Sequence, residues 1–299
     1  MPGDLLPTPV ITVIDRDAVN LPFSKGIMAT SILATGVDTP TAHRLAKLIE
    51  RDLIARDVRE ISADQLAALA TVTIAGHLEP DQADRYARWR RAKRAGRPFV
   101  VVLCGAPGVG KSTLATRLAV RLGVDRVIAS DAIREVLRNV IPPTVLPELH
   151  VSTFEAADPD EPPLTSFRRQ ARVVSDACAA VVGRLVVEGM NVIVDGVHLL
   201  PGVIRKELAR RGSGAVVVEF LLTLEDERLH RIHLQRRMQR QPARAGHRHL
   251  DLFPVIRRIQ ADLSVTAARE GLHIHDVGQS GTLTQRVVDA IVDAQAGTP

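Results

Sequence analysis

Three glycines, a lysine and two hydroxyl residues stand between positions 105 and 113 at the spacing of a phosphate-binding loop. The segment reads Gly-Ala-Pro-Gly-Val-Gly-Lys-Ser-Thr. Its glycines let backbone N–H groups turn toward phosphate oxygens, and the helix expected after it adds a positive dipole end. Lys111 has the reach for β- and γ-phosphates, and Ser112 carries an oxygen for Mg²⁺. The pattern predicts a bound nucleoside triphosphate, ATP, with Mg²⁺, and the expected phosphate contacts from this motif are Gly105, Gly108, Gly110, Lys111 and Ser112.

Asp131 follows a short apolar segment at 126–129 and stands where a helix begins. A carboxylate at this place could accept the proton of an acceptor hydroxyl or hold Mg²⁺. Arg134, one helical turn later, could grip an anionic group of the acceptor through two hydrogen bonds. The alternative is that Asp131 only caps the helix, and the two roles are compatible.

A second acid, Asp195, follows the apolar run at 191–194, where the Walker B acid of a nucleotide-binding sheet stands. We expect Asp195 to orient Mg²⁺ or one of its water molecules. Whether Asp131 or Asp195 makes the main Mg²⁺ contact stays open. His198, three residues on, could touch a phosphate or carboxylate of the acceptor, or it could be structural.

The segment from 228 to 258 holds nine arginines and one carboxylate, which predicts an anionic partner. Arg236 and Arg240 are four residues apart, so they share a helix face. We expect a mobile lid over about 228–250 that closes on the transferring phosphates, with Arg236 and Arg240 in catalysis. The alternatives are a solvated helix face and a nucleic-acid footprint. Because the segment has one aromatic residue for base stacking, a small phosphorylated acid is a better partner than nucleic acid, and we expect Arg244 and Arg248 among the cations that bind it.

The sequence argues against a disulfide, a zinc site, a membrane span and a signal peptide. The two cysteines, Cys104 and Cys178, both lie in apolar segments and fit reduced core thiols better than a disulfide. The histidines lack the repeated ligand spacing of a zinc site, so no metal besides Mg²⁺ is expected. No apolar run reaches the length of a membrane span, and the first residues lack the basic flank of a signal peptide. We therefore expect a cytoplasmic protein with no membrane partner.

Strand and helix patterns alternate from residue 98 onward, which predicts an α/β fold with a five-stranded parallel sheet flanked by helices. Ligands bind at the carboxyl ends of the strands in such sheets, where Asp131 and Asp195 stand. The strands are expected at 99–104, 126–129, 191–194, 215–222 and 272–276, and the helices at 111–122, 132–138, 168–188, 201–211, 225–241, 253–270 and 283–294.

The residues before this core predict a small, mainly helical domain at 8–80. A short β-like segment at 10–14 comes first, and three helical patterns follow, beginning near Ser24, Thr39 and Ser62. Ser62 and Gln65 form a capping-box pattern. The basic stretch 81–97 favours a helical linker, which leaves 98–299 as the nucleotide-binding domain.

The order of these motifs resembles that of the archaeal-type 2-phosphoglycerate kinases, P-loop kinases with an N-terminal ATP-cone-like domain. The resemblance covers nearly the whole chain and is carried by the segments at 105–113, 130–138, 192–202 and 247–263. It implies ATP-dependent phosphorylation of 2-phosphoglycerate to 2,3-bisphosphoglycerate. It further implies nucleotide contacts that include Val109 and Thr113, and an acceptor side that includes Asp131, Arg134, His198 and Arg248.

The N-terminal domain departs from the ATP-cone pattern. Asp15 stands at a usual lysine position and Ala18 at a usual glycine position. An acid beside a triphosphate is unfavourable. We therefore expect that this domain has kept its fold as a regulatory or interface domain, including as a contact between copies of the chain.

Two other functions fit the same motifs. A nucleotide-sensing regulator or ATPase switch would hydrolyse ATP without a small acceptor, and a kinase could instead act on another hydroxy acid or on nucleic acid. Stimulation of ATP turnover by a small acid would distinguish a kinase from an ATPase switch. Salt-dependent oligonucleotide binding would favour a kinase that acts on nucleic acid.

Overall fold

The computed structural model describes residues 10–14, 20–156, 158, 160–240, 250–279 and 283–297. The chain divides into two compact units, Met1–Gly96 with Val120–Gly123, and Arg97–Ala119 with Val124–Pro299. Each unit has its own sheet. Within the described residues, no helix has the length and apolar character needed to cross a membrane.

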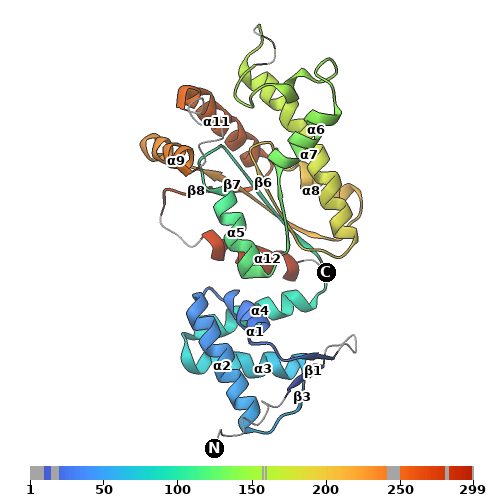
Figure 1. The fold of residues 1–299 in the computed structure, drawn as a ribbon, viewed down its shortest axis with the longest axis vertical. Helices are drawn as coiled ribbons and strands as arrows, with labels where there is room; N and C mark the ends of the chain where they lie inside the picture. Colours follow the sequence, from blue (N-terminus) through green and yellow to red (C-terminus); the bar gives the residue numbers. More distant parts are fainter. Residues whose placement is uncertain are drawn as a thin grey trace, which may run out of the picture. The chain divides into compact units, whose positions relative to one another are not determined.

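Among its described residues, the first unit contains a three-stranded sheet and four complete helices (Figure 1). Strand β1 (Thr12–Ile14) lies between β2 (Asn20–Pro22), which is antiparallel to it, and β3 (Glu60–Ser62), which is parallel. The segment predicted at 10–14 is thus a strand, whereas β2 and β3 were not predicted. The two departures from the ATP-cone pattern, at Asp15 and Ala18, lie outside the described residues.

Local capping explains where the helices of the first unit begin. The Ser24 side chain accepts a hydrogen bond from the Ile27 N–H before α1 (Lys25–Leu33), and Asp38 accepts one from Thr41 before α2 (Thr39–Ala55). Both halves of the predicted capping box are present before α3 (Ala63–His77), because Ser62 and Gln65 bond each other's backbone. The three predicted helix starts are confirmed.

The segment predicted as a linker forms α4 (Pro80–Arg94). Its Ala83 and Tyr86 belong to the apolar core of the first unit, and Tyr86 is 1% exposed. That core also contains Ile32, Leu45, Ile49 and Ile74 from the other helices. The stretch 80–94 is therefore part of the first unit's packing, because one face of the basic helix carries large apolar side chains.

The second unit is built on a five-stranded sheet in the order β5-β6-β4-β7-β8, and every neighbouring pair is parallel. This confirms the predicted fold class. The strands are β4 (Phe99–Gly105), β5 (Arg126–Ala129), β6 (Val192–Gly196), β7 (Val216–Thr223) and β8 (His273–Asp276).

Helices flank this sheet (Figure 1). Helix α7 packs against α8 and α11 and contacts β6, and α12 contacts β7. The helices are α5 (Lys111–Leu122), α6 (Ser130–Val140), α7 (Pro163–Val187), α8 (Val203–Arg210), α9 (Glu227–Arg240), α11 (Phe253–Arg269) and α12 (Leu283–Ala296), with a 3₁₀ turn, η1, at Pro147–His150.

Strand position in the sheet accounts for the sequence pattern. The central strand β4 is buried at every residue, as expected for a strand covered on both faces, whereas the edge strand β5 exposes Arg126 and Val127. Ala129 stands opposite Asp195, and Leu103 stands opposite Asp195 on the other side. The carboxyl ends of β4, β5 and β6 therefore meet at one edge, which brings the P-loop, Asp131 and Asp195 together.

Candidate active site

The loop from Gly105 to Gly110 connects β4 to α5 in the conformation that its glycines permit. Gly105, Gly108 and Gly110 have φ values of 144°, 84° and 90°, a region that other residues rarely adopt. Lys111 begins α5 and donates from Nζ to the carbonyl oxygen of Ala106 at 2.8 Å. Burial lowers the pKa of Lys111 to about 8, against the attraction of Asp195 and Asp131. The lysine is thus held in the loop, with a charge that phosphate binding would stabilise.

Ser112 and Asp195 form the second part of the site. The Ser112 hydroxyl donates to Asp195 Oδ2 at 2.8 Å, and Asp195 is 5% exposed. Burial raises the pKa of Asp195, although the Ser112 hydrogen bond and Lys111 oppose this effect. A hydroxyl and a carboxylate oxygen are the donors that Mg²⁺ prefers, so the pair fits that ion. In the part of the chain that the structure describes, no group of three or more His, Cys, Asp or Glu side chains forms a separate metal site.

Gly196 allows helix α6 to begin against strand β6. A Cβ at Gly196 would lie 1.7 Å from the Ser130 Oγ, so any larger residue would displace the start of the helix. Ser130 is fully buried. Because Asp131 follows it directly, this close approach sets the position of the Asp131 carboxylate relative to Asp195.

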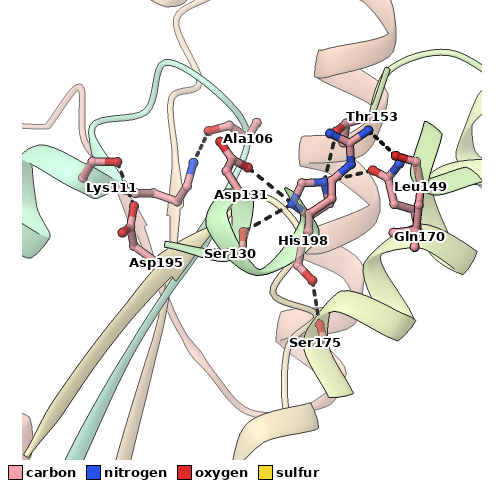
Figure 2. A network of polar contacts seen from close by, with 12 residues as sticks. Ala106, Lys111, Ser130, Asp131, Leu149, Thr153, Gln170, Ser175, Asp195 and His198 are labelled. Carbon is pink, nitrogen blue, oxygen red and sulfur yellow. Dashed lines mark hydrogen bonds and ion pairs between the residues drawn. The ribbon is translucent and has the colours of Figure 1, made fainter. Parts of the chain in front are cut away.

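Asp131 and His198 form a hydrogen-bonded pair at the mouth of the site (Figure 2). Asp131 Oδ1 lies 3.4 Å from His198 Nδ1, and the Asp131 side chain is 56% exposed. The hydrogen bond from His198 is the main cause that lowers the pKa of Asp131, and Lys111 adds to it. Asp131 is therefore ionised at neutral pH and open to solvent, as a group that accepts a proton from a hydroxyl must be.

His198 itself lies inside the unit, at 1% exposure. Nδ1 is also 3.3 Å from the Ser130 Oγ, and Nε2 lies 3.0 Å from the Thr153 Oγ1 and 2.9 Å from the Gln170 Oε1. Burial lowers the pKa of His198, opposed by Asp131. Its ring nitrogens are occupied by protein groups (Figure 2), so the structure places this residue behind Asp131 and away from the surface that an acceptor would contact.

Arg134 braces the segment that follows α6. Its Nη2 donates to the carbonyl oxygens of Leu149 and Val151, at 2.8 and 2.5 Å. Gln170 of α7 donates to the carbonyl oxygen of Glu148 in the same segment. The segment around η1 is therefore fixed to α6 and α7 beside Asp131, and Arg134 is among the side chains that hold its backbone.

The arginines of α9 are placed differently from the expectation. Arg237 interacts electrostatically with Lys111, Asp131 and Asp195, whereas Arg236 is exposed. The Arg240 side chain and the residues Arg244 and Arg248 lie outside what the structure describes. The α9 arginine that acts on the site within the described residues is therefore Arg237, which was not among the predicted lid cations.

Comparison with known proteins places the chain in a family. The AAA domain family model matches residues 100–254, which contain the P-loop, Asp131, Asp195 and all of α9. A 2-phosphoglycerate kinase of Methanopyrus kandleri is 36% identical over 86% of this chain and 78% of its own length. This chain belongs to the 2-phosphoglycerate kinase family.

Further members of the 2-phosphoglycerate kinase family align over a similar extent. The relative from Pyrococcus horikoshii is 34% identical, with 81% of each chain covered. Among solved structures, a shikimate kinase from Acinetobacter baumannii in complex with shikimate matches 68% of this chain and 95% of its own, at 17% identity and a TM-score of 0.37. The resemblance inferred from the motifs is confirmed by the sequence relatives.

Several residues of the site were not predicted, although some had a detectable signal. Thr153 and Gln170 contact His198 from 45 and 28 positions away, and no local pattern reveals such contacts. Arg237 had a signal, because it shares a helix face with His230, His233 and Leu234. Lys111, Ser112, Asp131 and Asp195 were predicted, and the structure brings these four together.

Proposed function

We propose that this chain transfers the γ-phosphoryl group of ATP to the hydroxyl of 2-phosphoglycerate, with 2,3-bisphosphoglycerate and ADP as products. The observation that carries the proposal is an ionised, open Asp131 next to the buried Lys111 and the Ser112–Asp195 pair, in a chain whose relatives are named 2-phosphoglycerate kinase.

The P-loop supplies the donor half of the site. Glycines at positive φ leave N–H groups free to meet phosphate oxygens, and the first turn of α5 adds its own N–H groups. Lys111 has a pKa of about 8 without ligand, so a bound triphosphate favours its charged form. Gly105, Gly108, Val109, Gly110, Lys111, Ser112 and Thr113 are the proposed nucleotide contacts.

Ser112 and Asp195 would hold Mg²⁺, and Asp131 is a further carboxylate that acts electrostatically on Asp195. When bound, the ion neutralises charge on the β- and γ-phosphates of the nucleotide. Asp195 is buried and Asp131 is exposed, which divides their roles. We assign the metal to Asp195 and the acceptor hydroxyl to Asp131.

Asp131 supplies the acceptor half. Its carboxylate can accept a hydrogen bond from the acceptor hydroxyl and orient that oxygen toward the γ-phosphorus. Because the transition state of phosphoryl transfer is loose, the proton moves late, so a weakly basic carboxylate suffices. Arg237 brings a positive charge to the same place, as the transferring phosphoryl group requires.

A coupled assay of ADP release across a panel of acids tests the function. The protein, ATP and Mg²⁺ are mixed in turn with 2-phosphoglycerate, 3-phosphoglycerate, glycerate and phosphoglycolate, and a blank omits the acid. We expect strong stimulation by 2-phosphoglycerate. Equal ADP release with and without acids would refute the kinase and indicate an ATPase switch, and stimulation by a different acid would overturn the acceptor assignment alone.

A further inference from the structure

One face of helix α9 lies along the outer side of the P-loop. His230, His233, Leu234 and Arg237 share this face, since residues three and four apart lie on one side of a helix. His230 Nε2 lies 2.7 Å from the Pro107 carbonyl oxygen, and His233 Nδ1 lies 3.0 Å from the Gly108 carbonyl oxygen. A carbonyl oxygen only accepts, so both ring nitrogens must donate. Two successive P-loop carbonyls are thus held by histidines one helical turn apart.

Packing fixes this contact. A Cβ at Gly108 would lie 2.9 Å from the Leu234 Cδ2 and 3.2 Å from the His230 Cδ2, so α9 approaches the loop as closely as a glycine allows. His230 is fully buried, and its ring meets the edge of Phe253 at 5.4 Å between centroids. Arg231 stacks 3.9 Å above the same Phe253 ring. The first half of α9 is therefore wedged between the P-loop and the start of α11.

The held carbonyls determine where the neighbouring N–H groups point. In a planar trans peptide, the C=O and the N–H of the next residue point in opposite directions. The Pro107 carbonyl and the Gly108 N–H belong to one peptide group, and the Gly108 carbonyl and the Val109 N–H belong to the next. When both carbonyls face α9, both N–H groups face away from it, toward the interior of the loop where phosphate would bind.

The same face of α9 carries Arg237 one turn beyond His233. Arg237 acts electrostatically on Lys111, Asp131 and Asp195, so its positive charge lies within reach of the reacting groups. The hydrogen bonds of His230 and His233 thus connect the orientation of the loop to the position of a cation at the transfer site.

We propose that His230 and His233 are positioning residues that turn the Gly108 and Val109 N–H groups toward the nucleotide phosphates and seat Arg237 at the transfer site. The proposal rests on the proposed function only for the identity of the nucleotide as ATP. It concerns the loop that binds the donor, and it requires no particular acceptor.

Substitution of His233 by its two amide analogues tests the hydrogen bond. In His233→Asn the side-chain N–H₂ can replace the Nδ1 donor, whereas in His233→Gln it reaches the Nε2 position and misses the Gly108 carbonyl. Gln235→Ala, on an exposed position of the same helix, is the matched control. The readouts are the Kd of ATP by titration calorimetry without acceptor, the thermal midpoint, and kcat and KM with 2-phosphoglycerate.

We expect His233→Gln to weaken ATP binding about 3- to 10-fold, which corresponds to the loss of one neutral hydrogen bond. His233→Asn and Gln235→Ala should bind ATP within about twofold of the unmodified protein. Wild-type affinity in His233→Gln, or an equal loss in both amide variants, would overturn the proposal. Because binding is measured without acceptor, a chain that fails to phosphorylate 2-phosphoglycerate but shows this pattern would refute the proposed function and retain the positioning role.

Discussion

Asp131 Oδ1 lies 3.4 Å from one ring nitrogen of His198, and the other nitrogen of that ring lies 2.9 Å from the Gln170 Oε1. Both neighbours are oxygens that accept hydrogen bonds. A neutral imidazole has a single N–H, so it can donate to Asp131 or to Gln170 but not to both at once. The tautomer of His198 therefore decides whether its N–H donates to Asp131, the proposed acceptor-side carboxylate, or to Gln170 of helix α7.

The two amide analogues of His198 should separate these roles. His198→Asn keeps a donor near the Nδ1 position and should retain kcat within about tenfold. His198→Gln loses the donor to Asp131, and misorientation of a reacting group by about 1 Å costs on the order of 10²-fold in rate. Steady-state kcat and KM of both variants check this prediction, with circular dichroism to confirm folding. Similar kcat values in the two variants would contradict a role of His198 through Asp131.

Lys111 should take up a proton when ATP binds at high pH. Its pKa is about 8 in the free protein, and phosphates raise it, so the bound state holds more protons above that pH. ATP affinity is therefore expected to fall as pH rises past about 8, by up to tenfold per pH unit. Calorimetry in two buffers of different ionisation enthalpy at pH 9 measures the uptake directly. Lys111→Arg cannot lose its proton in this range and should show none; uptake of the same size in that variant would exclude Lys111 as its source.

Asp195→Asn should raise the Mg²⁺ concentration needed for half-maximal activity by at least about tenfold. The amide preserves the shape of the side chain and removes the charge that a hard cation requires. The matched control is Asp125→Asn, an exposed acid directly before β5. Titration of activity with MgCl₂ at saturating ATP gives the result, and an unchanged Mg²⁺ dependence in Asp195→Asn would move the metal to another carboxylate.

His230 should make the protein less stable in acid. Burial lowers the pKa of His230 below its ordinary value of 6.5, so the unfolded chain binds a proton that the folded chain resists. Its contribution is fully present above about pH 6.5 and is lost as the pH falls toward the folded pKa. The thermal midpoint should drop between pH 7 and pH 5, and less steeply in His230→Gln, which retains a donor toward the Pro107 carbonyl. If the thermal midpoint of His230→Gln fell with pH as steeply as that of the unmodified protein, His230 would not be the source of the acid sensitivity.

The core sheet could be predicted because each strand leaves a local signal. Phe99–Gly105 is buried at every residue and is therefore apolar throughout, and glycines mark the turn that follows. Asp131 and Asp195 could be predicted for the same reason, since Asp131 comes two residues after β5, Asp195 lies at the carboxyl end of β6, and the carboxyl ends of parallel strands meet at one edge.

The neighbours of His198 and the face of α9 that meets the P-loop depend on tertiary packing and could not be predicted from local sequence patterns. His198 follows the end of β6 by two residues, yet α7 and the segment at η1 cover it, and only the three-dimensional arrangement reveals those neighbours. The helical spacing of His230, His233 and Arg237 is visible in the sequence, but Arg236 and Arg240 of the same segment also have helical spacing. Which face meets the P-loop is decided by Leu234 and His230 against Gly108.

The most direct test of the central claim is the transfer of label from [γ-³²P]ATP to 2-phosphoglycerate by the unmodified protein and by Asp131→Asn. The unmodified protein should form one labelled 2,3-bisphosphoglycerate per ADP. In Asp131→Asn transfer should fall by about 10²- to 10⁴-fold, the range for loss of a general base, with ATP affinity retained. Labelled inorganic phosphate in place of labelled bisphosphoglycerate, or near-normal transfer by Asp131→Asn, would contradict the account.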